Sequence, residues 1–377
     1  MKKSTSKKAS TIQDRLEVLQ TRVVVERDSV SSISSSDFPF HTNNQYPNHD
    51  VLERLRKKIK IAIEKKSQYD MEFDIIGIDA SIANALRRIM IAEVPTMAIE
   101  KVFIYDNTSI IQDEVLAHRL GLIPIKADPD QFDFKQSTEH PTDQNTIVFK
   151  LKQECKRNPK ATANDTDPKQ LYINHNVYSA ALTWEPKGDQ AERFKNCFIG
   201  PVHDDILIAQ MRPGQKIELE AHCEKGCGKE HAKWSPAATA SYRLMPEIIL
   251  KEEITGDLAD KFASCFAPGV VEVEKTNVDG ESIKVAKVVN PRIDTVSREV
   301  LRHKEFEDKV QLTRIRDHFI FRVESTGILD SEKIVFDSLQ ILSSKCTMLL
   351  KALDLKLKEK EEVDTSQKND NAMDLDV

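Results

Sequence analysis

The sequence lacks any apolar run near the roughly 20 residues that a membrane-spanning helix requires, so we expect no membrane association. No apolar stretch follows the lysines near the amino terminus, which argues against a secretory signal peptide. The 6 cysteines are too dispersed for a disulfide framework and indicate reduced thiols of a cytosolic or nuclear protein. The net charge of −6 argues against an overall basic nucleic-acid-binding protein.

Motifs of the common enzyme classes are also missing. The sequence contains no Gly-x-x-x-x-Gly-Lys phosphate loop, no Gly-x-Ser-x-Gly nucleophile elbow and no Asp-x-Asp-x-Asp cluster. His118 could act as a metal ligand or a base, but no Cys, Asp or second His accompanies it at helical spacing. We therefore expect a structural histidine and a protein without catalytic activity of its own.

One segment carries residue types that bind metals. Between His222 and His231, two thiols and two imidazoles could bind zinc tetrahedrally, with Cys223 and Cys227 as the candidate sulfur ligands. However, His222 and Cys223 are adjacent and would point to opposite faces of a strand. The expectation is therefore an ordinary hairpin tip and a protein without a cofactor.

Residues 79–95 predict a short helix. Asp79 or Ser81 can accept hydrogen bonds from the first helical turn, and Pro95 cannot continue a helix. The apolar residues recur at spacings of three and four and are Ile82, Leu86 and Ile89.

The same helix carries Asn84, Arg87 and Arg88 among residues that are otherwise mostly small or apolar. Two guanidinium groups on such a helix need carboxylates, phosphates or the surface of a partner. The alternative is an ordinary core helix whose arginines reach solvent, and the spacing alone does not decide between the two.

A long helix is predicted near the carboxyl terminus, beginning at Asp330 or Ser331. Its apolar seam has the spacing of a heptad repeat and consists of Val335, Leu339, Leu342, Cys346, Leu349 and Leu353. This seam is larger than one small sheet needs, which makes a partner helix plausible. The alternative is a core helix that packs on its own sheet.

The remaining pattern indicates an α+β fold. A hairpin is expected over residues 59–76, a strand over 313–324, and a mostly β region over 126–291. A second helix over 114–120 should stop at Gly121 in the left-handed conformation. The lysines over 57–66 form a solvated face, or alternatively the contact of a DNA-binding adaptor.

Several motifs together resemble the α-like subunits of multi-subunit RNA polymerases. They occur in the order found in that family and are Asn84–Met90, Glu93–Pro95, Gln112–Pro124, His231–Pro236 and Asp317–Ser325. The RNA polymerase II member of the family carries a zinc-binding cysteine cluster after its Leu-Ile-Pro stretch, whereas residues 126–146 contain no cysteine here. The chain therefore looks like the larger α-like subunit shared by RNA polymerases I and III, with the RNA polymerase II subunit and a free-standing zinc-dependent enzyme as alternatives.

The resemblance implies a discontinuous dimerisation domain over residues 49–125 and 292–356. A β-rich domain over 126–291 would be inserted between these segments, and 1–48 and 357–377 would be mostly disordered tails. The implied partners are a small α-like subunit, bound by the two predicted helices, and the second-largest polymerase subunit, which Arg87 and Arg88 would contact. The implied location is the nucleus, including the nucleolus, without sequence-specific DNA contact.

Overall fold

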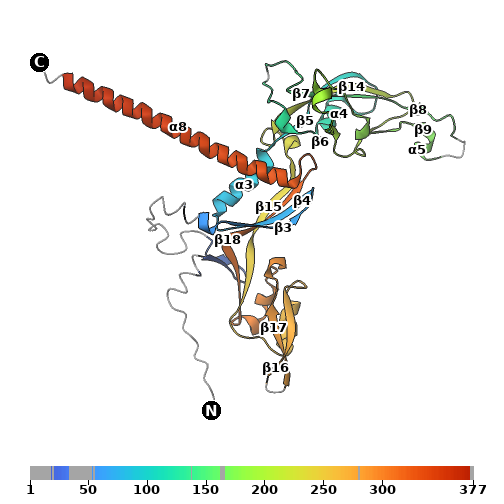
Figure 1. Ribbon diagram of the computed structural model, residues 1–377. Coiled ribbons are helices and arrows are strands. Elements are labelled where there is room, and N and C mark those ends of the chain that lie inside the picture. Colours follow the sequence, from blue (N-terminus) through green and yellow to red (C-terminus); the bar gives the residue numbers. More distant parts are fainter. Residues whose placement is uncertain are drawn as a thin grey trace, which may run out of the picture. The chain divides into compact units, whose positions relative to one another are not determined.

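The computed structural model describes residues 21–33, 56–136, 138–161, 166–278 and 281–373, together with residues 18 and 53. Most of the predicted amino-terminal tail lies outside these residues. The fold is α+β, as predicted, and is built from antiparallel sheets and a few helices (Figure 1). Within the described ranges, every helix is too short or too polar to span a membrane.

The largest sheet has six strands in the order β2-β1-β18-β4-β3, and β15 pairs with β18 beside this path. Its strands are β1 (Arg22–Val25), β2 (Val30–Ser31), β3 (Lys60–Lys66), β4 (Asp70–Ile76), β15 (Ala237–Leu250) and β18 (Val310–Ser325). The neighbouring strands β3 and β4 confirm the predicted hairpin. β4 alternates because it buries Met71, Phe73 and Ile75 on one face.

A second sheet has four strands in the order β11-β7-β14-β5. These are β5 (Pro95–Asn107), β7 (Thr146–Glu154), β11 (Thr183–Trp184) and β14 (Lys216–Cys227). The described residues also form four two-stranded sheets. Two of them pair β6 (Ile125–Lys126) with β12 (Gly200–Pro201) and β8 (Lys156–Arg157) with β9 (Tyr172–Ile173). The other two pair β10 (Asn176–Tyr178) with β13 (Leu207–Gln210) and β16 (Val271–Val278) with β17 (Glu281–Val288). The middle of the chain is thus mostly β, as expected.

The helices are α3 (Ala80–Ala92), α4 (Asp113–Gly121), α5 (Pro168–Leu171), α6 (Gln190–Arg193), α7 (Asp257–Ser264) and α8 (Ser331–Met373). Short 3-10 turns lie between them, including η5 (Ala232–Trp234). The expected left-handed stop at Gly121 is wrong, because Gly121 is still helical and Leu122 ends α4 in a right-handed conformation. A Cβ at Gly121 would lie 3.4 Å from Ile99 O, an ordinary contact, so the packing of α4 on β5 does not itself require glycine at this position.

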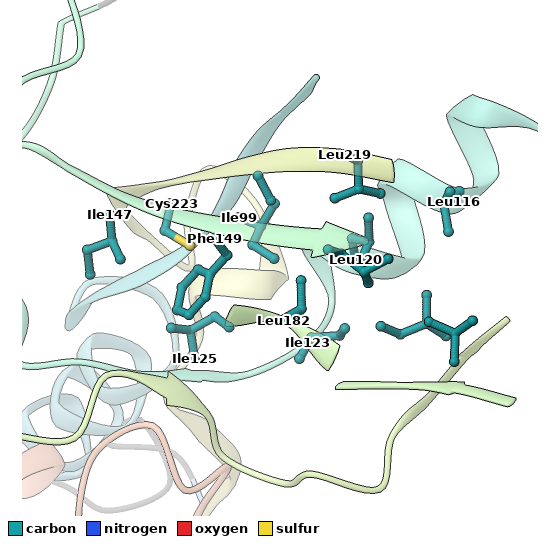
Figure 2. Packing of buried hydrophobic residues seen from close by; sticks show 14 of the residues in the cluster. Ile99, Leu116, Leu120, Ile123, Ile125, Ile147, Phe149, Leu182, Leu219 and Cys223 are labelled. Carbon is teal, nitrogen blue, oxygen red and sulfur yellow. The ribbon is translucent and has the colours of Figure 1, made fainter. Parts of the chain in front are cut away.

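Two compact units divide the chain, and each has its own core. The first takes Met1–Glu64, Glu72–Ala83 and Ser241–Phe321, and its core surrounds Phe262 and Phe306. The second takes Lys65–Met71, Asn84–Ala240 and Arg322–Val377. Its core joins α4 to the inner face of the four-stranded sheet, as Figure 2 shows for Leu116, Leu120, Phe149 and Leu219.

Both units are discontinuous in the chain. The assignment of a dimerisation function to residues 49–125 and 292–356 stays a prediction. α8 is also longer than expected, because it continues to Met373 through most of the segment predicted as a tail. That segment begins with Leu-Lys-Glu-Lys-Glu-Glu, residues that are strong helix formers even without an apolar periodicity.

Candidate partner-binding site

Helix α3 forms as its sequence predicts. Asp79 Oδ1 accepts the backbone N–H of Ser81 at 2.8 Å, so Asp79 rather than Ser81 caps the helix. Hydrogen bonds from Ser81 lower the pKa of Asp79, which keeps the cap ionised at neutral pH. Leu86 and Ile89 are only 5% and 3% exposed and belong to the chain's own core, whereas Ile82 is 36% exposed. Of this apolar face, only Ile82 is therefore open to a partner in this structure.

The two arginines of α3 have different surroundings. Arg87 is half-buried, and its Nε and Nη2 donate to Asn84 Oδ1 at 3.1 and 2.9 Å. This bond orients the guanidinium without neutralising its charge. Arg88 is exposed and has neither a hydrogen bond nor an ion pair with any described residue. Both positive charges are therefore open to an external acceptor.

Helix α8 begins inside the second unit and then leaves its core. Ser331 Oγ donates to Ser67 O at 2.7 Å, and Ile334 and Ser338 are buried. Further along, Leu349 and Leu353 are 66% and 60% exposed. From Leu339 onward, the large apolar side chains exposed on this stretch are Leu339, Met348, Leu349, Leu350, Leu353, Leu355 and Leu357, and Phe336 is exposed just before them.

Because a monomeric protein rarely exposes so many neighbouring large apolar side chains, this stretch has the character of an interface. We call it the α8 apolar surface. It contains three of the predicted seam residues, Leu339, Leu349 and Leu353, and Cys346 between them is exposed as well. Val335 and Leu342 are half-buried, close to where the helix leaves the core.

The end of α3 is bonded to α8, to the last residue of β14 and to the loop that follows β14. Lys345 Nζ on α8 lies 2.6 Å from Oε1 of Glu93, the residue after α3. Lys229 N donates to Ala92 O at 2.8 Å, and the Cys227 thiol donates to Glu93 O at 3.5 Å. The sequence gives no sign of these roles for Lys345 and Lys229, because nothing in the local pattern distinguishes a lysine that bonds to a distant helix end.

The candidate metal ligands between His222 and His231 do not form a metal-binding group in the structure. Cys223 is fully buried in the core of the second unit, and burial raises the pKa of its thiol. His222 faces other surroundings, with its Nε2 2.8 Å from Glu220 Oε1 and its ring 4.8 Å from that of Phe103. Burial also raises the pKa of Cys227. Among the described residues, no group of three or more potential ligands could hold a metal ion.

The expected hairpin tip at this segment is also wrong. β14 pairs with β5 and β7, whereas β15, which follows η5, pairs with β18 in the other sheet. The segment is therefore a crossing between two sheets. Gly226 and Gly228 permit close approach here, since a Cβ at Gly226 would lie 2.4 Å from the Trp234 ring.

The other two candidates occupy ordinary surroundings. His118 is exposed on α4, with its ring 6.1 Å from that of His231. Among the lysines over 57–66, Lys65 pairs with Asp70 at 2.5 Å and Lys66 with Glu332 at 2.6 Å. These pairs favour the solvated face over a DNA contact.

An exposed apolar helix surface beside a cationic helix is an arrangement for binding other proteins, with no catalytic group among the candidates. A family model of the RNA polymerase Rpb3/Rpb11 dimerisation domain matches residues 72–346. The chain therefore belongs to this family of non-catalytic RNA polymerase subunits, which confirms the resemblance seen in the sequence.

Individual proteins of this family show which subunits the chain is most similar to among those compared. The DNA-directed RNA polymerases I and III subunit RPAC1 of Bos taurus is 50% identical over 343 residues, which cover 90% of this chain and 97% of that protein. The subunit of the same name from Saccharomyces cerevisiae is 47% identical over 331 residues, covering 87% and 97%. The DNA-directed RNA polymerase II subunit rpb3 of Dictyostelium discoideum is 31% identical over 303 residues, covering 79% and 95%.

Proposed function

We propose that this chain is the larger α-like subunit shared by nuclear RNA polymerases I and III. It serves as a non-catalytic assembly subunit in the transcription of ribosomal, 5S and transfer RNA. The identity of about half its residues with subunits of that name supports this reading. The RNA polymerase II subunit is the second candidate, but its relative is less similar, and residues 126–146 lack the cysteines expected of it.

The observation that carries the proposal is the α8 apolar surface. Its exposed leucines and methionine would be covered by a helix of the small α-like subunit. Each large side chain that becomes buried contributes about 1.5–3 kcal/mol, from which the cost of ordering the two chains must be subtracted. Several such side chains suffice for a stable heterodimer. Ile82 on α3 offers a separate exposed apolar contact, while Leu86 and Ile89 are buried in the chain's own core.

The cationic side of α3 provides the second contact. Arg87 and Arg88 have no carboxylate partner among the described residues, and a guanidinium matches a carboxylate in a bidentate geometry. We assign them to the second-largest subunits of the two polymerases. Because the net charge is −6 and the lysines near β3 are partly paired, no DNA contact is assigned. The protein would act in the nucleus, including the nucleolus.

Co-expression tests the proposal. The full chain should form a 1:1 complex with the small α-like subunit, seen as a single mass in light scattering after gel filtration. Native mass spectrometry of complexes purified through this chain should then find it in both RNA polymerases I and III. A stable monomer that ignores the small subunit would contradict the heterodimer, and a complex that contains only RNA polymerase II subunits would favour the second candidate.

A further inference from the structure

A pocket of about 530 Å³ lies in the second unit between α4, β5 and η5, outside both contacts proposed above. Its size is within the range of roughly 300–1,000 Å³ that is usual for ligand sites. Its apolar lining includes the exposed Leu122 and the half-buried Val102, whereas the side chain of Ile99 belongs to the core of the unit. We call it the α4–β5 pocket. It combines an apolar wall with ionisable groups that the two proposed contacts do not use.

On one side of the pocket, the charges of Lys233 and Glu100 neutralise each other. Lys233 pairs with Glu100, donates to Ile99 O at 2.9 Å, and has its Nζ 4.4 Å from the centre of the Trp234 ring. This lysine is therefore held by three partners and is not available to an incoming ligand. The charge of Glu100 is likewise satisfied by the chain itself.

On the other side of the pocket, two carboxylates have no partner among the described residues. Glu114 and His118 lie one turn apart on α4, and Glu230 and His231 line the pocket from the segment before η5. Neither carboxylate has an ion pair or a hydrogen bond with any described residue. His231 Nδ1 accepts the N–H of Lys233 at 3.1 Å, and the ring of His118 lies 6.1 Å from that of His231. Because Nδ1 of His231 already accepts, the other ring nitrogen of His231 carries the proton, so only the His118 imidazole is free to accept a further hydrogen bond.

The chemistry of these groups selects a cation. A metal ion does not fit, since the described residues offer no set of three ligands at suitable distances. A phosphate or other anion would meet two unpaired carboxylates. An arginine side chain fits best, because its methylene groups can lie on the apolar wall while its five N–H donors reach several acceptors at once. A lysine offers only three donors from a single point.

We propose that the α4–β5 pocket binds an arginine side chain carried by an extended segment of another polypeptide. The guanidinium pairs with Glu114 and Glu230 and donates to the His118 imidazole, and the methylene groups lie along Leu122. This is a third contact surface of the chain. It does not depend on the heterodimer or on Arg87 and Arg88.

The test uses the full chain and a blocked tripeptide, acetyl-Ala-Arg-Ala-amide, followed through the histidine ring protons by NMR. His118→Gln and His231→Gln variants assign the two signals. We expect both signals to shift saturably with the arginine peptide. The peptide with citrulline, which has the same shape without the charge, should bind at least about tenfold more weakly because the charge-assisted hydrogen bonds are lost. The lysine peptide should fall between them.

The matched variants are Glu114→Gln with Glu230→Gln, and Glu252→Gln with Glu253→Gln as the control. Glu252 and Glu253 are exposed, make no hydrogen bond or ion pair with any described residue and lie outside the pocket. The pocket variant should lose at least about tenfold in affinity for the arginine peptide, and the control should retain it. Equal binding of the citrulline peptide, an unaffected pocket variant, or an absence of saturable shifts would each overturn the proposal, whatever the outcome of the heterodimer test.

Discussion

Lys345 Nζ lies 2.6 Å from Glu93 Oε1, which ties the middle of α8 to the residue that follows α3. Both side chains are partly exposed, so this ion pair contributes no more than about 1 kcal/mol to stability. Its importance is positional. The exposed leucines of α8 and the arginines of α3 belong to one compact unit, so both proposed contacts lie on the same unit.

The α8 apolar surface should be essential for the heterodimer and dispensable for the fold. Leu349→Asp with Leu353→Asp places charges on side chains that are already exposed, so the isolated chain should keep its melting temperature. Binding to the small α-like subunit should weaken by about 2–4 kcal/mol, as for central interface positions. Isothermal titration measures the loss. Gln340→Asp, at an exposed position of α8 whose neighbours one turn away lie outside this surface, is the control and should bind normally.

Replacing the arginines of α3 should separate the two proposed contacts. Arg87→Ala with Arg88→Ala removes two charges that have no carboxylate partner among the described residues. The heterodimer should therefore form as before, whereas the yield of co-purified second-largest subunit should fall several-fold. Arg302→Ala, which removes an exposed arginine paired with Glu299, serves as the comparison. An unchanged polymerase yield in the α3 variant would refute the assigned role.

A methyl group at residue 228 should disturb the end of α3. In Gly228→Ala, the Cβ would lie 2.3 Å from Ile91 O, a backbone atom that can move only with the helix. We expect a destabilisation of about 1–3 kcal/mol, together with weaker binding of the small subunit. Thermal unfolding and titration report the two effects. Gly121→Ala should be nearly neutral, because its Cβ would make an ordinary contact at 3.4 Å from Ile99 O.

The attachment of β1 should depend on pH. Arg22 Nε lies 2.6 Å from Glu247 Oε2. Burial of Glu247 opposes its ionisation, but hydrogen bonds from Arg22 and Thr313 outweigh burial and lower its pKa. A lowered pKa in the folded state stabilises the fold above the unfolded value of about 4.3, and this contribution is lost as pH falls through the folded value.

Hydrogen exchange of the β1 amides measures this effect. Arg22→Met should lower their protection at pH 7 by roughly 1–2 kcal/mol, between the values for exposed and buried pairs. The difference from the wild type should shrink as pH falls below about 4. Glu247→Gln should show the same loss at pH 7 with little pH dependence. A difference that stays constant down to low pH would exclude the ionic explanation.

Local patterns predicted the elements well where a single periodicity was involved. The spacing of Ile82, Leu86 and Ile89 indicated α3, and alternation from Met71 to Ile75 indicated β4. The segment from His222 to His231 was misread as a hairpin tip because its turn residues look the same whether the next strand returns to one sheet or enters another. The spacing of the apolar residues of α3 likewise does not show which of them face outward.

The sequence by itself determined the α+β class, the two helices and, through its motifs, the polymerase family. Those features depend on short-range spacing and on the order of motifs, which a chain displays before it folds. Only the tertiary structure decided that Leu86 and Ile89 are buried while Leu349 and Leu353 are exposed. The tertiary structure also places Glu93 beside Lys345. It likewise brings together the residues that line the α4–β5 pocket. Such relationships depend on which surfaces the core has already covered, and the core is assembled from residues far apart in the chain.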